Sequence, residues 1–220
     1  MKAIIKRIIS PILQQASSIY LKKRRKYSYK NISVWVEPTV FPPFLTISTK
    51  LLLEFMETLA LKDKTFLELG CGCGIISILA AKKEAKVTAT DINAIALEAL
   101  QRNAADNCVS IAITKSDLFE NVRGQTFDII MINPPYYPKT PNSIDENAWF
   151  CGENFEYFEK LFVQLSDFST SENEIYMILS EDCELEKIKA IALKNEMAFE
   201  LVSEKKVAAE KNYIFRLGNL

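Results

Sequence analysis

The sequence predicts an α/β fold, in which a mostly parallel sheet carries helices on both faces. From about residue 46, short apolar segments of strand length alternate with longer segments of helical periodicity. The last two strand-like segments have no helix between them, so one strand near the C-terminus must run antiparallel. With 220 residues, of which 49% are hydrophobic and 25% charged, the chain is long enough for one large core.

The expected sheet has seven strands, each bounded by turn-forming or charged residues. Their ranges are 65–69, 86–90, 109–114, 127–132, 174–179, 198–205 and 212–217. Helices are expected where apolar residues recur at intervals of three and four. Their ranges are 49–59, 74–83, 94–106, 155–168 and 185–195. Three prolines make 37–45 an irregular connector before the first of these helices.

Residues 1–40 are predicted to form a basic N-terminal arm that precedes the main domain at 41–220. The arm holds nine Lys and Arg residues and one acid, Glu37, whereas the remainder holds 18 basic and 27 acidic residues. Apolar spacing predicts an amphipathic helix over 2–20, and 32–36 alternates like a short strand. Lys6 and Arg7 interrupt the apolar run, so neither a signal peptide nor a membrane span is expected. The basic cluster is open to two interpretations, an electrostatic contact with RNA or a solvated helix face.

The histidine and cysteine contents of the chain limit the catalytic and metal-binding chemistry that is possible. The sequence has no histidine, which excludes histidine-based triads and histidine metal ligands. Its five cysteines are scattered and odd in number, so we expect free thiols in a cytoplasmic protein and no metal site.

A glycine-rich loop, Gly70-Cys71-Gly72-Cys73-Gly74, joins the first strand of the sheet to a helix. Its glycines permit a tight turn and a close ligand, and amides at the helix start are expected to face that ligand. Glu68 precedes the loop, where it would attract an ammonium and repel a pyrophosphate. This acid, and a spacing that differs from the dinucleotide fingerprint, favour S-adenosylmethionine (SAM) over a dinucleotide.

Two further acids follow the next two strands. Asp91 is placed to accept hydrogen bonds from ribose hydroxyls, and Asp117 from an adenine amino group. Ile92 and Leu118 are expected to sandwich the adenine ring. A lone aspartate at such a place is usually a helix cap or a surface carboxylate, but acids at three consecutive strand ends favour a binding site.

The sequence Asn133-Pro-Pro-Tyr136 follows the fourth strand. The oxygens of the Asn133 side chain and the Pro134 carbonyl can each accept one N–H of a planar amide or amino group. Such a nitrogen is a poor nucleophile, and holding it directs its lone pair toward a methyl donor. Tyr136 offers a flat face on which a planar substrate could stack.

Together these motifs resemble those of class I SAM-dependent methyltransferases with an Asn-Pro-Pro-Tyr signature. Within that group the chain is similar to the HemK/PrmC-type protein-glutamine N5-methyltransferases and to the small methyltransferase domains that act on RNA bases. The resemblance covers about residues 37–217. It implies a Rossmann-like fold, SAM as methyl donor, S-adenosylhomocysteine (SAH) as product, and a methyltransferase domain over 41–220.

The resemblance also implies roles for individual residues. The expected catalytic residues are Asn133, Pro134 and Tyr136. The expected cofactor-binding residues are Glu68, Gly70, Cys71, Gly72, Gly74, Asp91, Ile92, Asp117, Leu118 and Asn133.

Three functions are compatible with the sequence. The first, which the overall resemblance favours, is methylation of a glutamine side chain in a protein substrate, such as a ribosome-associated protein or a translation factor. The second is methylation of an exocyclic amine in structured rRNA or tRNA, which the basic arm favours. The third is a SAM-binding module without catalysis, against which the intact Asn-Pro-Pro-Tyr sequence argues.

Overall fold

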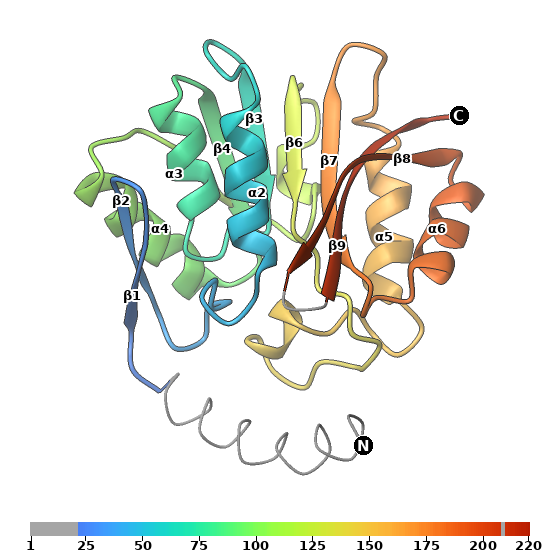
Figure 1. The fold of residues 1–220 in the computed structure, drawn as a ribbon, viewed down its shortest axis with the longest axis horizontal. Coiled ribbons are helices and arrows are strands. Elements are labelled where there is room, and N and C mark those ends of the chain that lie inside the picture. Colours follow the sequence, from blue (N-terminus) through green and yellow to red (C-terminus); the bar gives the residue numbers. More distant parts are fainter. Residues whose placement is uncertain (1–21, 208–209) are drawn as a thin grey trace.

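The large sheet of the protein carries helices on both faces (Figure 1). The computed structural model describes residues 22–207 and 210–220, so the predicted helix over 2–20 lies outside the described residues. The sheet order is β5-β4-β3-β6-β7-β9-β8. β9 runs antiparallel to both of its neighbours, and the other described pairings of this sheet are parallel. The predicted sheet and its antiparallel strand are confirmed. The strands are β3 (Thr65–Leu69), β4 (Lys86–Asp91), β5 (Ala112–Lys115), β6 (Ile129–Ile132), β7 (Glu174–Ser180), β8 (Met197–Val207) and β9 (Glu210–Asn219).

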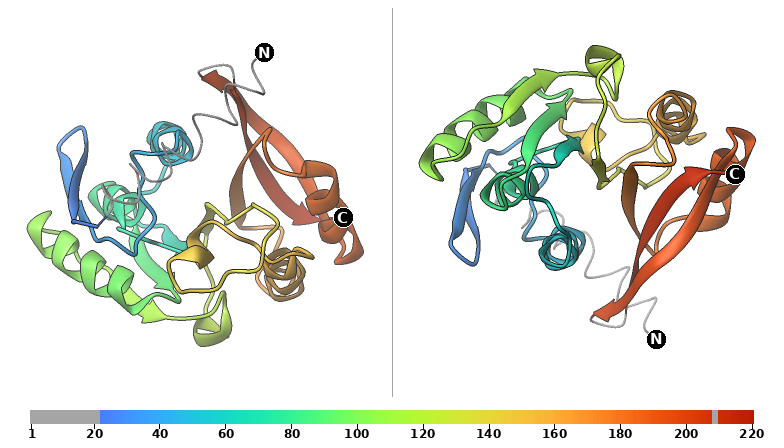
Figure 2. Two further views of the ribbon diagram at one scale, coloured as in Figure 1. Left: turned by 90° about the horizontal axis from the view of Figure 1, so that it is seen from below. Right: turned by 90° about the horizontal axis from the view of Figure 1, so that it is seen from above.

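Helices cover each face of the sheet over a separate apolar core, and the two views of Figure 2 show the sheet between them. The central strands are apolar on both faces: Phe66 of β3 points into one core, and its neighbour Leu67 into the other. The first core contains residues of α2 (Ser48–Glu57), α3 (Ile75–Lys82) and α4 (Ala94–Asp106); the second contains residues of α5 (Glu156–Leu165) and α6 (Leu185–Lys194).

The third strand of the sheet is shorter than the sequence predicts. β5 begins at Ala112, not at Val109, because the backbone N–H of Val109 donates to the carbonyl of Ala104 at the end of α4. Cys108 makes this turn with a φ of 56°. Val109 and Ile111 pack against the first core from a loop, so their apolar character reflects burial without strand pairing.

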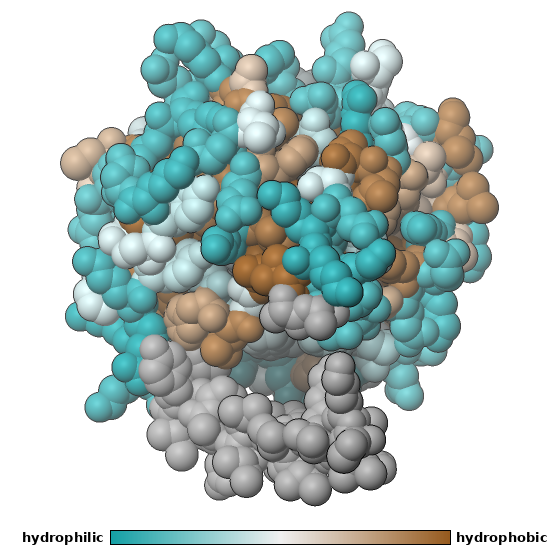
Figure 3. Space-filling view, in the orientation of Figure 1, coloured by the Kyte–Doolittle hydropathy of each residue, from teal (hydrophilic) through white to brown (hydrophobic). Residues whose placement is uncertain are grey.

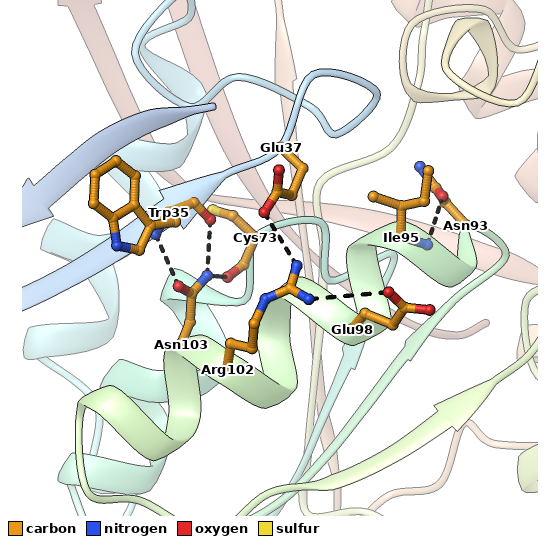
Figure 4. A network of polar contacts seen from close by, with 8 residues as sticks. All are labelled: Trp35, Glu37, Cys73, Asn93, Ile95, Glu98, Arg102 and Asn103. Atoms are coloured by element: carbon orange, nitrogen blue, oxygen red, sulfur yellow. Dashed lines mark hydrogen bonds and ion pairs between the residues drawn. The ribbon is translucent and has the colours of Figure 1, made fainter. Parts of the chain in front are cut away.

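A β-hairpin precedes the large sheet. It consists of β1 (Arg25–Tyr29), which the sequence analysis missed, and β2 (Ile32–Val36), which it predicted. The side chain of Asn103 in α4 accepts from the N–H of Trp35 and donates to its carbonyl, at 2.8 and 2.9 Å (Figure 4). The hairpin therefore packs on the main body of the protein, and a domain boundary at residue 40 stays a prediction.

The face shown in Figure 3 is mostly hydrophilic, and its hydrophobic residues gather in separate patches. Among the described residues, no helix is both long and apolar enough to cross a membrane. Most of the buried apolar side chains of the described residues lie in the two cores.

Candidate active site

The loops that follow β3, β4, β5 and β6 surround a cavity of about 360 Å³ at the carboxyl edge of the sheet. This volume lies within the range of small-molecule sites, and parallel sheets bind ligands at this edge. Nine of the residues predicted from the sequence line it: Glu68, Gly70, Cys71, Gly72, Asp91, Ile92, Asp117, Leu118 and Asn133. Gly74, Pro134 and Tyr136 do not line the cavity.

The glycine loop is bonded to the protein through four of its backbone amides, which precede the start of α3 at Ile75. The N–H groups of Gly70 and Cys71 both donate to the carbonyl of Thr90, each at 2.9 Å. The N–H of Gly72 donates to Oδ2 of Asp91 at 2.9 Å, and that of Gly74 to the carbonyl of Cys71. These bonds tie the loop to β4 and fix the cavity floor.

Gly74 has a packing role. Its φ of 77° is in the left-handed region, and a Cβ at this position would overlap the side chain of Leu100 in α4. This glycine therefore lets the loop lie against α4, and it contributes to the site by holding the loop in place.

Glu68 is buried beside the cavity, with 5% of its surface exposed. Oε2 accepts hydrogen bonds from the backbone N–H of Ser77, at 2.9 Å, and from the Ser77 hydroxyl. Burial raises the pKa of Glu68 to about 8, although the bonds from Ser77 oppose this rise. A cation in the cavity would therefore find a carboxyl group that ionises near neutral pH.

Asp91 ends β4 with both carboxylate oxygens already oriented. Oδ2 accepts from Gly72, and Oδ1 accepts from the backbone N–H of Asn93 at 2.8 Å. Burial raises the pKa of Asp91, and these amide bonds oppose the rise. Each oxygen keeps a lone pair, so the group can accept two further hydrogen bonds from a ligand.

Asp117 follows β5 and is held by a lysine that the sequence analysis did not identify. Nζ of Lys160, in α5, lies 2.6 Å from Oδ2 of Asp117 and 2.7 Å from Oε1 of Glu120. Lys160 also lines the cavity. Leu118 is buried, with a φ of 52°, and Ile92 is 39% exposed, so two apolar side chains flank this part of the cavity.

Asn133 lies at the end of β6 and borders the cavity with Pro135. Within the part of the chain that the structure describes, its side chain makes no hydrogen bond, so both amide groups are available to a substrate. Tyr136 lies outside the cavity lining, and its ring packs against that of Tyr137, with ring centroids 4.7 Å apart. A stacking role for Tyr136 requires that its ring turn toward the cavity.

The segment after the Asn-Pro-Pro-Tyr sequence forms one wall of the cavity. The N–H of Tyr137 donates to the carbonyl of Trp149, and the N–H of Cys151 donates back to the carbonyl of Tyr137. Trp149 packs against Phe41, with ring centroids 5.0 Å apart, so this segment meets the connector that follows β2. Further residues of the two segments line the cavity; they are Thr39, Val40, Phe41, Pro43, Pro141, Ile144, Asn147, Ala148, Phe150, Cys151 and Gly152.

The lining of the cavity fits SAM. Among the described residues, neither Glu68 nor Asp91 has a lysine or arginine partner within 4 Å, although both carboxylates are buried or nearly so. Buried carboxylates without a cation indicate a ligand that supplies positive charge or hydroxyl donors. SAM offers both, in its ammonium and its ribose. At Gly70, an added Cβ would meet no protein atom within 4 Å, so the glycine leaves open space beside the cavity.

Comparison with known proteins gives the same assignment. Residues 31–148 match the family model described as the methyltransferase small domain. A Methanocaldococcus jannaschii protein, provisionally named a protein N5-glutamine methyltransferase, is 32% identical over 182 residues, which cover 78% of this chain and 90% of that protein. The ribosomal RNA small subunit methyltransferase C of Actinobacillus pleuropneumoniae is 36% identical over 117 residues, which cover 51% of this chain and 35% of that protein.

A solved structure shows the same fold with its cofactor. A 16S rRNA guanine-N2 methyltransferase of T. thermophilus, in complex with AdoMet (SAM) and guanosine, has a TM-score of 0.64 at 18% identity, covering 88% of this chain and 50% of that one. The expected Rossmann-like fold and the expected cofactor are thus confirmed. The chain belongs to the methyltransferase small domain family and is a SAM-dependent methyltransferase.

Proposed function

We propose that this enzyme methylates a planar nitrogen, and that the acceptor is the side-chain amide of a glutamine in a protein. The observation that carries the proposal is the placement of Asn133. Its side-chain amide, which has no hydrogen-bond partner among the described residues, borders the same cavity as Glu68 and Asp91. A nitrogen bound by Asn133 would therefore lie beside the cofactor site.

The residues of this chain act by binding and orienting the acceptor. When bound, SAM supplies an electrophilic methyl group on its sulfonium. Asn133 Oδ1 and the Pro134 carbonyl oxygen each accept one N–H of the acceptor amide, which favours a pyramidal nitrogen with its lone pair directed into the cavity. The two prolines restrict the loop, so these acceptors keep their positions. No strong general base is needed, because the methylated nitrogen loses its proton readily.

The extent of similarity favours glutamine as the acceptor. The relative with a provisional glutamine activity aligns over 90% of its own length, so it supports an assignment for nearly the whole enzyme. By contrast, this chain spans about a third of the length of the rRNA methyltransferase, and the match covers only part of that enzyme. We therefore place a glutamine-bearing protein first among the substrates.

An exocyclic amine of an RNA base is the second candidate. Its nitrogen is planar like that of an amide, so Asn133 would bind both in the same manner. The observation that favours it is the basic stretch 22–30, which holds six Lys and Arg residues and no acid.

The two acceptors are separated by finding where the methyl group goes. Purified enzyme is incubated with ribosomes, a ribosome-free extract and SAM labelled in its methyl group, and RNA is then separated from protein. We expect label in protein, with methylglutamine recovered after complete proteolysis. Label confined to RNA would overturn the glutamine assignment.

Two variants link that label to the site. Asn133→Ala should reduce transfer by at least a hundredfold, while SAH affinity stays within a few-fold of wild type. The matched control is Asn173→Ala; Asn173 lies before β7 at the opposite edge of the sheet, and its hydrogen bonds among the described residues are to its own loop. The control should methylate at the wild-type rate.

A further inference from the structure

The β1–β2 hairpin presents a basic surface with an exposed aromatic ring. Alternation along β1 points Tyr27 and Tyr29 toward the first core and Lys26 outward, where it lies opposite Trp35 of β2. We call the exposed surface the hairpin face. It consists of Lys22, Lys23, Arg24, Lys26 and Trp35.

Within residues 22–207 and 210–220, no acidic side chain pairs with the lysines of the hairpin face. Among the described residues, Lys22, Lys23 and Lys26 have no carboxylate within 4 Å, and residues 22–36 include no acid. Lys30, in the turn, instead pairs with Glu57 at 2.8 Å and does not belong to the face. Clustered like charges repel one another, and a polyanion would relieve that repulsion. The face is therefore complementary to a phosphate backbone.

Trp35 provides a rigid aromatic platform, a ring on which a base can stack, among the basic residues of the hairpin face. The residue is 38% exposed, although its backbone N–H and carbonyl are both bonded to the buried side chain of Asn103 (Figure 4). The guanidinium carbon of Arg24 lies 4.7 Å from the centre of the ring. An aromatic ring beside cations is the combination that stacks unpaired bases while binding their phosphates.

The hairpin face is directly connected to the cavity. β2 ends at Val36, and Thr39, Val40 and Phe41 line the cavity. Phe41 lies six positions after Trp35, and six residues span at most about 20 Å of extended chain. A nucleic acid strand on the face would thus lie within a few nucleotides of the cavity.

We infer that the hairpin face binds a single-stranded segment of RNA, with a base stacked on Trp35 and phosphates held by the lysines. The bound RNA would orient the enzyme on its substrate, whether that substrate is the RNA itself or a protein assembled with it. The inference does not depend on the glutamine assignment, because RNA binding is measured without methyl transfer.

The test measures RNA affinity of the full chain by fluorescence anisotropy. The probe is a 12-nucleotide oligouridylate labelled with fluorescein, titrated from 50 to 300 mM salt. One variant, K22E/K23E/K26E, reverses the charge of the face, and the control K82E/K86E/K206E makes the same change in net charge at exposed lysines elsewhere. Trp35→Ala removes the platform, and Trp35→Phe keeps an aromatic ring.

The expected result is loss of affinity only from changes on the face. K22E/K23E/K26E should weaken binding at least tenfold and reduce the slope of log affinity against log salt by about 2, since each single-strand phosphate contact contributes about 0.7. Trp35→Ala should weaken binding about tenfold, and Trp35→Phe less than threefold. Retained SAH binding establishes that each variant is folded.

Three results would overturn the inference. Equal losses from the two triple variants would mean that only net charge matters. Unchanged affinity in Trp35→Ala would mean that the ring is not a platform. Absence of RNA binding by wild type, together with loss of methylation of a purified protein substrate in K22E/K23E/K26E, would identify the face as a protein-docking surface.

Discussion

Lys160 holds Asp117 in place at the edge of the cofactor cavity. Its ammonium is 2.6 Å from Asp117 Oδ2 and also 2.7 Å from Glu120, so it bridges two acids near the end of β5 from the second turn of α5. Because this bridge engages Oδ2, the other carboxylate oxygen of Asp117 can accept a hydrogen bond from the adenine amino group. The ion pair thus positions the group that we propose binds the base.

Replacing this lysine should weaken cofactor binding moderately. The Lys160 and Asp117 side chains are 39% and 44% exposed, so solvent screens the pair and its contribution is about 0.2–1 kcal/mol. Lys160→Met should therefore lower SAH affinity about two- to fivefold, as measured by calorimetry. The control is Lys189→Met, which removes an ion pair on α6 away from the cavity. Equal affinities of the two variants would contradict a positioning role for Lys160.

The raised pKa of Glu68 leads us to expect that cofactor binding releases a proton. Burial raises its pKa to about 8, so the carboxyl group of the free enzyme is mostly protonated at pH 7. An ammonium beside it favours the ionised form, so SAH affinity should rise with pH between 6 and 7.5, by at most about tenfold per unit. Calorimetry at pH 7 in buffers of different ionisation enthalpy should report close to one proton released.

The variant Glu68→Gln distinguishes this coupling from other titrations. It should bind SAH more weakly and show no dependence of the binding enthalpy on the buffer. Folding stability and SAH affinity depend on pH in opposite directions. Glu68 holds a proton in the native state that it releases in the unfolded chain above its usual pKa of 4.5. The stabilisation from Glu68 is therefore complete below pH 4.5 and is lost as pH rises through 8. A buffer-independent binding enthalpy in wild type would refute the coupling.

Gly74 should be required for stability more than for cofactor contact. In Gly74→Ala, the new Cβ would overlap Leu100 and occupy a backbone with a φ of 77°, at a combined cost of about 2–4 kcal/mol. The melting temperature should fall by about 4–12 °C. The control Gly124→Ala has a φ of 78° but meets no atom within 4 Å, so it incurs only the backbone cost. Equal falls in the two variants would show that contact with Leu100 is unimportant.

Asn103 should couple the hairpin to the glycine loop. Its buried side chain bonds both backbone groups of Trp35 and donates to the carbonyl of Cys73 at 2.9 Å. Asn103→Ala leaves three polar groups without partners and should lower the free energy of unfolding by about 2–4 kcal/mol, measured in urea. Asn121→Ala, at a more exposed site, should cost less than 1 kcal/mol. A change below 1 kcal/mol in Asn103→Ala would contradict this coupling.

Much of the fold and of the cavity can be predicted from the sequence because the polar residues of the site stand at the ends of the predicted strands. Asp91, Asp117 and Asn133 each end or follow a short apolar strand, and parallel strands bring their carboxyl ends to one edge. Strand periodicity and the position of each polar residue therefore predict that these side chains lie close together. All three line one cavity in the structure.

The remainder depends on contacts between distant segments, which local patterns do not encode. Lys160 contacts Asp117 although the two residues are 43 positions apart in the sequence. No motif near Lys160 indicates that it belongs to the site. β1 was missed because its basic residues obscure the alternation of Tyr27 and Tyr29, the one signal that could have revealed it. The packing of Tyr136 against Tyr137, outside the cavity lining, is likewise a tertiary contact that the Asn-Pro-Pro-Tyr sequence does not reveal.

If Asn133 presents a planar nitrogen to the methyl donor, the methylated atom must be that nitrogen, and its chemical identity can be measured. Substrates labelled by the wild-type enzyme with SAM carrying a heavy-isotope methyl group would be digested to amino acids and nucleosides and analysed by mass spectrometry. We expect N5-methylglutamine, present with wild type and absent with Asn133→Ala. A methyl group found on carbon, oxygen or sulfur, or formed equally by Asn133→Ala, would contradict this expectation.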